Sequence, residues 1–428
     1  MKRFIKTTAA LITAGSILIG MSGCTSSVKN VKAADLMDGV TAREVTVETD
    51  ANAYSPELTD FAVRLFNACN ENSKDNENTL ISPLSVLLAL SMTANGAQGE
   101  TLEQMENVLG LPVSKLNEFA YAYSKVLKGR PDSSGTLSLA NSIWFTSDPG
   151  FHVNNDFLQV NADYYNASVY SAPFDDSTIK DINNWVNKKT DGMIPSILEE
   201  IPESAVMYLV NALAFDAEWT EAYFDYQVKE NIYTTADGTQ KKVPFLNRKE
   251  DTYIEDDNAI GFIKYYKGGK YAFAALLPNE GTTPADYLRS IDGAHLRNML
   301  VSAQKWEVIT SLPKFETKYS MEMADVLKAM GMPRAFDENR ADFSKLGRSD
   351  GWNIFISKVF HKTFIAVDEK GTKAGAATIV QTENGGSSQP IEKPKPKEVY
   401  LTRPFVYMLI DCETNVPFFI GIMNDPEK

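Results

Sequence analysis

Histidine is scarce in this chain of 428 residues, and the signature motifs of hydrolytic enzymes are missing from it. The three histidines are His152, His295 and His361, and none of them belongs to an H-E-x-x-H metal-binding pair. No G-x-S-x-G sequence is present to form a nucleophile elbow. The sequence therefore gives a hydrolase little support, and we expect no catalytic residue, no metal site and no cofactor.

Cysteine and net positive charge are also in short supply. Beyond residue 24 the chain holds two cysteines, Cys69 and Cys412, and both lie in apolar patterns where a free buried thiol is common. No disulfide framework is therefore implied. The formal net charge of −14 argues against binding to nucleic acid or to an anionic surface by electrostatic attraction.

The first 23 residues lack the length of a membrane span but have the parts of an export signal. A basic start, Met1-Lys2-Arg3, precedes a mostly apolar run over residues 9–19 and the sequence Met-Ser-Gly-Cys that ends at Cys24. That ending resembles the lipobox of bacterial lipoproteins, in which cleavage leaves a diacylated cysteine at the N-terminus. We predict a lipoprotein signal peptide over residues 1–23, lipidation at Cys24 and an exported protein anchored at the cell surface. The alternative is an ordinary secretory signal with an incidental cysteine.

The rest of the chain lacks any linker that would divide it into domains. Residues 24–50 are polar and poor in aromatics, which predicts a tether that holds the folded body off the membrane. The other long tract rich in glycine, serine and proline lies within residues 368–405, too close to the C-terminus to leave a second domain behind it. We therefore predict one large domain over residues 51–428.

Helix signals come first along this domain and strand signals dominate later. Ser55-Pro56 and Ser82-Pro83 each offer an N-cap followed by a first-turn proline. Thr101 and Gln104 have the spacing of a capping box, and Ile182, Trp185 and Val186 have that of a fourth helix. The strand candidates are residues 206–215, 271–278, 359–367, 405–411 and 417–423. The class is α+β with substantial sheet.

Two polar residues inside these apolar runs need partners. Asn211 lies in the middle of a strand that is apolar on both faces, and His361 shares the alternating face of Val359, Thr363, Ile365 and Val367. A buried amide or imidazole without a hydrogen bond costs about 1 to 3 kcal/mol. Either the two residues are satisfied separately, or they meet each other and the hydroxyls of Ser82 and Ser85 in one cluster.

Several separated motifs, in the right order, resemble the serpins. They include "NTLISPLSVLLALSMTANGAQGET", "INNWVNKKTDGMIPSIL", "LVNALAFDAEW", "LPKFE", "HKTFIAVDEKGTKAGAAT", "RPFVYMLID" and "PFFIGIMNDP". The likeness covers the body from about residue 54 to residue 428. It implies a large central, mostly antiparallel β-sheet, further sheets, eight or nine helices and an exposed reactive-centre loop over about residues 369–397.

The resemblance also assigns roles to single positions. Ser82, Ser85, Asn211 and His361 match the shutter, a polar cluster beneath the point where the central sheet must open. Trp219, Lys314 and Glu369 match the breach, where the loop first enters the sheet, with Lys314 and Glu369 as an ion pair. The hinge of the loop is matched by Glu369, Gly371, Thr372, Lys373, Ala374, Gly375, Ala376, Ala377 and Thr378.

The amino-acid composition of the hinge favours a loop that can insert into the central sheet as a new strand. Side chains alternate along a strand, so Thr372, Ala374, Ala376 and Thr378 would face the core together, and all four are small and uncharged. The resemblance then implies a suicide inhibitor: a serine or cysteine protease cuts the loop and is trapped as an acyl-enzyme while the cut loop enters the sheet. The alternative is a non-inhibitory serpin that acts as a carrier.

The scissile bond is less well defined than the hinge. The tract beyond the hinge is several residues longer than in typical serpins, so counting from the hinge and counting back from the far end give different answers. The candidates are Asn384, Gly385, Gly386, Ser387, Ser388, Ile391 and Lys393. The small residues among them favour an elastase-like or subtilisin-like target protease, and we expect the inhibitor to be a monomer.

Overall fold

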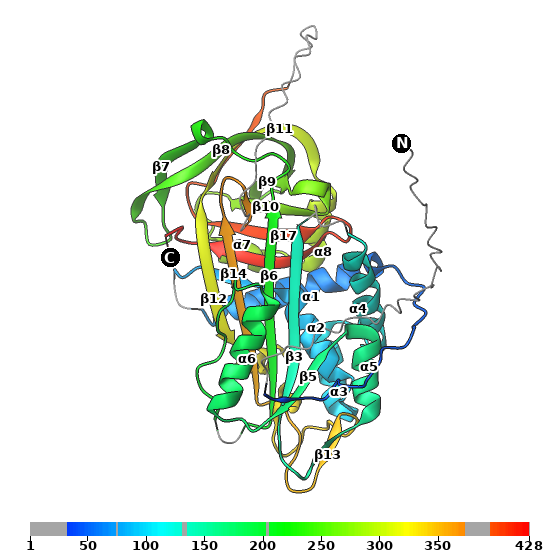
Figure 1. Ribbon diagram of the computed structural model, residues 1–428. Coiled ribbons are helices and arrows are strands. Elements are labelled where there is room, and N and C mark those ends of the chain that lie inside the picture. Colours follow the sequence, from blue (N-terminus) through cyan, green and yellow to red (C-terminus); the bar gives the residue numbers. More distant parts are fainter. Residues whose placement is uncertain (1–31, 74–75, 131–134, 203–204, 373–393, 428) are drawn as a thin grey trace, which may run out of the picture.

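The computed structural model describes residues 32–73, 76–130, 135–202, 205–372 and 394–427. Within these ranges the chain forms nine α-helices and three β-sheets (Figure 1). The helices are α1 Ser55–Glu71, α2 Pro83–Ala94, α3 Gly99–Leu109, α4 Val113–Lys128, α5 Asn155–Tyr165, α6 Asp176–Lys189, α7 Pro284–Ser290, α8 Gly293–Val301 and α9 Ala324–Met330. The predicted α+β class is confirmed.

The central sheet has seven strands and is mostly antiparallel, as predicted. Its order is β1 Ala34–Asp35, β5 Ser168–Ala172, β3 Thr136–Thr146, β6 Met207–Glu218, β15 Gly371–Thr372, β14 Lys358–Val367 and β12 Phe315–Glu322. Two neighbouring pairs are parallel, β3 with β5 and β6 with β14. The strand predicted from the apolar run at residues 206–215 is thus a central strand of this sheet, buried on both faces.

The second sheet has nine strands and a third sheet has two. The second sheet runs in the order β16 Lys397–Tyr400, β11 Gln304–Pro313, β8 Gln240–Glu255, β9 Ala259–Tyr265, β10 Tyr271–Pro278, β17 Phe405–Asp411, β18 Val416–Met423 and β2 Thr79–Ile81, with β7 Val228–Thr234 paired to β8. The small sheet pairs β4 Phe151–Val153 with β13 Gly347–Ser349. Each of the strand predictions made from the later half of the sequence is confirmed.

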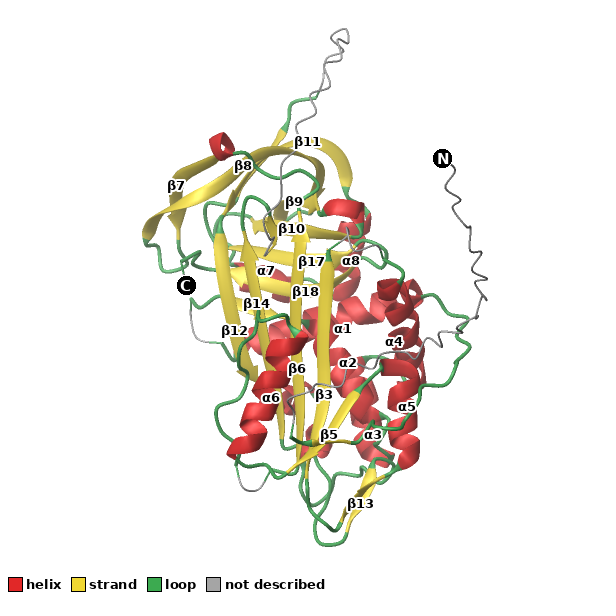
Figure 2. Cartoon of the chain, viewed as in Figure 1, coloured by secondary structure: helices red, strands yellow, loops and turns green. Residues whose placement is uncertain are grey.

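Helices cover the two faces of the central sheet differently (Figure 2). Helix α2 is packed among α1, β3, β6 and β18, and all twelve of its residues are buried, as expected of a helix that is apolar all round. Helix α6 lies on the opposite face and places Ile182, Trp185 and Val186 in a separate small core against β6 and β3. The central sheet is therefore enclosed from both sides.

Two predicted capping roles were wrong, although both helices are present and Pro56 lies in the first turn of α1 as predicted. Ser55 is the first residue of α1 instead of its N-cap, and its hydroxyl donates to Asn52 Oδ1 at 2.9 Å. Thr101 and Gln104 do not form a capping box, since α3 begins at Gly99. Their oxygens accept backbone N–H groups of Asp342 and Arg334 from a distant part of the chain, each at 2.9 Å. The N-cap predicted at Ser82 is confirmed, with its side chain accepting from the Ser85 N–H.

Residues 32–50, which the sequence assigned to a tether, pack against the body. β1 pairs with β5, and the backbone N–H groups of Lys32 and Ala33 donate to Asp181 Oδ2 at 2.8 and 3.0 Å. Arg43 binds the buried carboxylate of Asp163 through its backbone and its guanidinium. This part of the polar segment is therefore docked, because its backbone and charges find partners that composition alone does not indicate. No helix in the described ranges is long and apolar enough to span a membrane.

Candidate functional site

The central sheet changes its pairing pattern between β6 and β14. The two strands pair directly, in parallel, from Tyr208 opposite Lys358 to Leu213 opposite Thr363. We call this stretch the seam. Beyond it the strands are separated by β15, which is antiparallel to both. Parallel pairing is slightly less stable per residue than antiparallel pairing, so the seam is the weaker kind of ladder.

The first hinge residues already lie inside the sheet. Gly371 pairs with Glu218, and Thr372 pairs with Ala217 on one side and Val367 on the other. Thr372 is 1% exposed and its side chain points to the main core. A Cβ atom at position 371 would lie 2.1 Å from the Ala217 carbonyl oxygen, so only glycine allows this close approach.

Two aromatic residues hold the chain that leads into β15. Trp219 donates its backbone N–H to the Lys370 carbonyl at 2.8 Å and its Nε1–H to the Asp368 carbonyl at 2.9 Å. The Tyr223 N–H donates to the Glu369 carbonyl at 2.8 Å. Because three consecutive carbonyl groups are bound in this way, the segment that leads into the loop is fixed before Thr372 is reached.

The three predicted breach residues meet at this point. Lys314 Nζ lies 2.5 Å from a carboxylate oxygen of Glu369, so the predicted ion pair is present. Burial alone would raise the pKa of Glu369, but the hydrogen bond from Lys314, a backbone hydrogen bond and the charges of Lys314 and Lys370 together outweigh it, so the pKa is lowered. Both side chains are about one third exposed, so the pair contributes modestly to stability.

A buried lysine, Lys264, packs against the rings of Trp219 and Tyr223, and the sequence analysis did not predict it. The Lys264 ammonium lies 4.6 Å from the ring centre of Tyr223 and 5.3 Å from that of Trp219, and it pairs with Glu250 at 2.7 Å. Burial lowers the pKa of Lys264, while the Glu250 carboxylate opposes that shift. A lysine in the apolar run of β9 was the signal that could have indicated a buried cation.

The polar residues of the predicted shutter form one cluster across the seam. His361 Nδ1 donates to Asn211 Oδ1 at 2.6 Å, and His361 Nε2 accepts the Ser82 backbone N–H at 3.0 Å. These two bonds require the neutral imidazole with its proton on Nδ1. Burial lowers the pKa of His361 to about 3, which agrees with that neutral form.

The cluster differs from the prediction in two details. The Ser82 hydroxyl caps α2 by accepting the Ser85 N–H, so His361 contacts the Ser82 backbone and not its hydroxyl. Asn141 of β3, which the sequence analysis missed, accepts from Asn211 Nδ2 at 2.8 Å and from the Ser85 hydroxyl at 3.3 Å. Asn141 lies among several polar residues of a half-buried strand, so nothing in the local pattern distinguished it.

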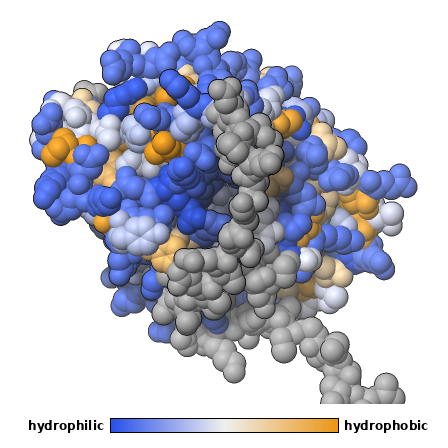
Figure 3. Space-filling model, turned by 90° about the horizontal axis from the view of Figure 1, so that it is seen from above, coloured by the Kyte–Doolittle hydropathy of each residue, from blue (hydrophilic) through white to orange (hydrophobic). Residues whose placement is uncertain are grey.

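Part of the predicted site falls outside the described residues. This applies to Cys24, to the hinge from Lys373 to Thr378 and to the candidate scissile positions from Asn384 to Lys393. The described residues begin again at residue 394, just before β16. β16 is an edge strand of the second sheet and pairs with β11. Seen from above, the described surface there is mainly hydrophilic, with scattered apolar residues (Figure 3).

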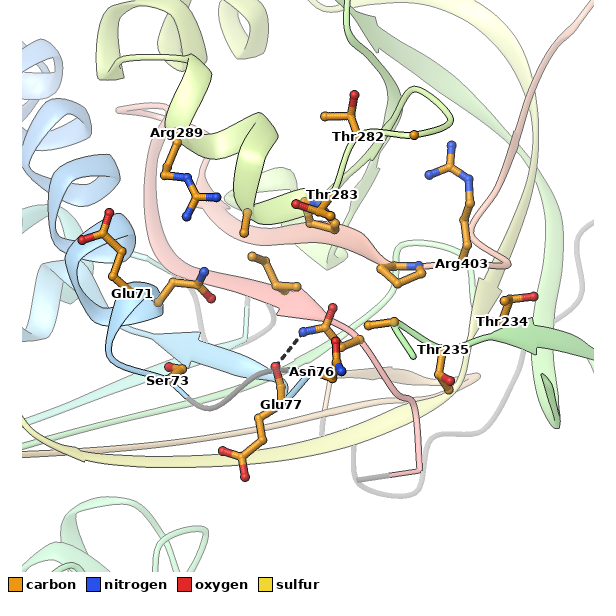
Figure 4. A pocket seen from close by; sticks show the side chains of 18 residues that line it. Glu71, Ser73, Asn76, Glu77, Thr234, Thr235, Thr282, Thr283, Arg289 and Arg403 are labelled. Carbon is orange, nitrogen blue, oxygen red and sulfur yellow. Dashed lines mark hydrogen bonds between the residues drawn. The ribbon is translucent and has the colours of Figure 1, made fainter. Parts of the chain in front are cut away.

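A separate pocket of about 850 Å³ lies between the end of α1, the start of α7 and the residues around β18 (Figure 4). Its walls are mainly polar and carry charges of both signs, from Glu71, Glu77, Arg289 and Arg403. In one wall of the pocket the Asn424 side chain donates to the Glu77 carbonyl at 2.7 Å. This pocket would suit a polar ligand better than an apolar one.

Residues 56–426 match the family model described as Serpin (serine protease inhibitor). Among curated proteins, an uncharacterised serpin-like protein of Thermococcus kodakarensis is 30% identical over 85% of this chain and 84% of its own length. Human neuroserpin is 27% identical over 89% of this chain and 94% of its own.

Among solved structures, the thermophilic serpin tengpin in its native state is 45% identical, with a TM-score of 0.86, and covers 92% of this chain and 100% of its own. The latent state of tengpin gives a TM-score of 0.74 at 41% identity, over 89% of this chain and 99% of its own. The described fold is thus more similar to the native form than to the latent form. This chain belongs to the serpin family, a family of protease inhibitors and not of enzymes.

Proposed function

We propose that this serpin is a suicide-type inhibitor that traps a serine protease, or a cysteine protease, as an acyl-enzyme. The protease cuts the reactive-centre loop, and the cut loop inserts along the seam and carries the protease with it. The observation that supports this most directly is β15: Gly371 and Thr372 already lie between β6 and β14. The inhibitor itself needs no catalytic group, since the protease supplies the chemistry.

The pairing directions supply a driving force for insertion. A strand that continues from β15 down the seam would replace one parallel ladder by two antiparallel ladders, one with β6 and one with β14. It would also bring its own backbone groups into hydrogen bonds on both sides. The inserted form should therefore be more stable than the form described here.

The register of β15 predicts where each hinge residue would arrive. If the inserted strand continues this register residue by residue along both neighbours, Thr378 would lie directly between Asn211 and His361. Insertion must break the hydrogen bond between those two side chains, and a threonine hydroxyl can both donate and accept in its place. The last of the small inward residues, Thr378, is thus polar, and in the inserted form it would meet Asn211 and His361, which need a polar partner.

The same register limits the scissile bond. Continued to the end of β6, it reaches Met207 opposite Thr382, so a full insertion uses the loop up to about Thr382. A cut just beyond this point favours the candidates from Asn384 to Ser388 over Ile391 and Lys393. We therefore propose a target with a small specificity pocket, of the elastase-like or subtilisin-like kind.

We also propose that the protein is exported and held at the cell surface by a lipid on Cys24. The support is the sequence alone: a basic start, an apolar run and a lipobox-like ending. The alternative function is a carrier serpin, for which the polar pocket of Figure 4 offers a place. The seated hinge, with its small inward residues, favours the inhibitor.

The test is incubation of the protein with a panel of serine and cysteine proteases. An inhibitor gives a complex of inhibitor and protease that survives boiling in detergent, and mass spectrometry of the released fragment locates the cut. A carrier would be cut or left intact without such a complex. If the proteases of the panel cut the loop but none forms a stable complex, the carrier function would replace the inhibitory function as our assignment.

A further inference from the structure

A hydrogen bond between two buried hydroxyl groups holds Thr372 in the sheet. Thr372 Oγ1 lies 2.5 Å from the hydroxyl oxygen of Tyr266, a residue that follows β9. Thr372 is 1% exposed and Tyr266 is fully buried. Burial raises the pKa of Tyr266 well above its ordinary value, so its hydroxyl keeps its proton and can donate at neutral pH.

We propose that Tyr266 is a positioning residue for loop insertion, and that its hydroxyl latches Thr372 between β6 and β14 before a protease arrives. Insertion of the cut loop then starts from a residue that is already in register with both strands. This inference rests on the proposed inhibitory function, but the latch itself exists in the uncut protein and can be measured there.

The surroundings of Tyr266 make the latch rigid. Its ring stacks on Trp219 with the ring centres 4.4 Å apart, and the edge of Phe215 meets it at 5.0 Å. Trp219 is in turn bound to the Asp368 and Lys370 carbonyl groups just ahead of β15. The Tyr266 hydroxyl is therefore held at a fixed point relative to the backbone that leads into Thr372.

The latch selects for a hydroxyl at position 372. A buried hydroxyl that loses its partner costs more than the bond itself contributes, because no water replaces the partner. Valine has nearly the shape of threonine but would leave the Tyr266 hydroxyl unpaired, whereas serine keeps the bond. Position 372 thus requires a side chain that is small and that also carries a hydroxyl group.

The latch matters because insertion competes with release of the protease. After the acyl-enzyme forms, either the loop inserts and the protease is trapped, or water completes the cut and the inhibitor is spent as a substrate. With Thr372 seated, the first antiparallel pairs with Ala217 and Val367 exist before the cut. Without the latch these pairs must first form, and more inhibitor is lost to hydrolysis.

Hydrogen exchange of the uncut protein tests the latch without any protease. The variants are Tyr266→Phe, Thr372→Val and the double variant, with Thr372→Ser as the conservative replacement. The matched control is Tyr223→Phe, because the Tyr223 hydroxyl is also buried beside Trp219 but has no partner among the described residues. Each single change should speed exchange of the amides at residues 371 and 372 by roughly tenfold, which corresponds to a loss of about 1.4 kcal/mol in the seated form.

The double variant distinguishes a latch from ordinary packing. When both hydroxyls are gone, neither is left unpaired, so exchange should be slower than the two single effects combined would give. Thr372→Ser and Tyr223→Phe should exchange like the wild type. Equal effects of Tyr266→Phe and Tyr223→Phe, or strictly additive effects in the double variant, would overturn the latch.

The second readout is the number of inhibitor molecules consumed for each protease molecule trapped. Tyr266→Phe and Thr372→Val should raise this ratio several-fold, while Thr372→Ser should leave it near the wild-type value. Unchanged ratios combined with faster exchange would mean that the latch exists but does not position the loop for insertion, which would overturn the proposal. If no protease forms a stable complex with the wild type, the inhibitory function fails, while the exchange result still decides whether the latch exists.

Discussion

His361 lies directly opposite Asn211 across the parallel seam, and their side chains share a hydrogen bond of 2.6 Å. The bond joins the two strands that the loop would have to separate under the proposed mechanism. It also requires a neutral imidazole, because His361 Nε2 accepts the Ser82 backbone N–H. The strength of the closed seam is therefore linked to pH.

Acid should weaken the native form through this histidine. Its pKa is about 3 in the folded protein and 6.5 ordinarily, so between these values the unfolded chain binds a proton that the folded chain does not. The full contribution to stability is present above about pH 6.5 and is lost as the pH falls toward 3, by roughly 1.4 kcal/mol per pH unit. Melting temperatures measured across this pH range should fall with the pH. In His361→Gln the melting temperature should depend less steeply on pH. A profile that is equally steep in His361→Gln and in His152→Gln, a change at an exposed histidine, would contradict the assignment to His361.

Under the proposed inhibitory mechanism, Thr372→Arg should convert this serpin from an inhibitor into a substrate. Thr372 faces the main core beside Tyr266, so an arginine there would bury a cation without a partner, at a cost of several kcal/mol. The hinge would stay outside the sheet, and protease would cut the loop without being trapped. Gel analysis after incubation with an active protease should show cleaved serpin and no stable complex. Glu398→Arg, at an exposed position of β16, is the control that should still form the complex.

Thr378→Val should harm the inserted form and spare the native form. If Thr378 arrives between Asn211 and His361, valine would leave their polar groups unpaired after insertion, at a cost of about 1 to 3 kcal/mol. The melting temperature of the uncut variant should match that of the wild type, while the cut variant should melt lower than the cut wild type. Equal melting of the two cut forms would mean that the register of β15 does not continue down the seam.

A cut in the loop should raise the melting temperature, although it breaks a peptide bond. A nick anywhere from about Thr382 to Lys393 frees the hinge to enter the seam, form two ladders of hydrogen bonds and bury its small side chains. Melting curves before and after limited proteolysis, with the nick located by mass spectrometry, measure the change. An equal or lower melting temperature after the cut would favour the carrier function.

The shutter could be predicted because two of its residues contradict their local pattern. Asn211 and His361 are polar residues in apolar strands, so each had to have a buried partner. Asn141 could not be found in this way, since its strand already mixes polar and apolar residues. The seated hinge was also beyond prediction, because it depends on Tyr266 and Trp219, which lie more than a hundred residues away in the sequence. The docked segment at residues 32–50 was missed for the same reason: its partners Asp163 and Asp181 are distant carboxylates.

That docked segment decides how a lipid-anchored protein would stand on a membrane. Lys32 follows Cys24 by eight residue steps, a reach of at most about 28 Å, so the body would sit close to the bilayer. Asp35 pairs with Tyr170 of β5, and the pairing continues across β3 to Tyr208, so Asp35 lies level with one end of β6. Thr372 lies beside Ala217 near the other end of β6, about 30 Å from Tyr208 along the strand (Figure 1). The loop would thus face outward, away from the lipid, and a protease caught by it would be drawn down the sheet toward the bilayer surface.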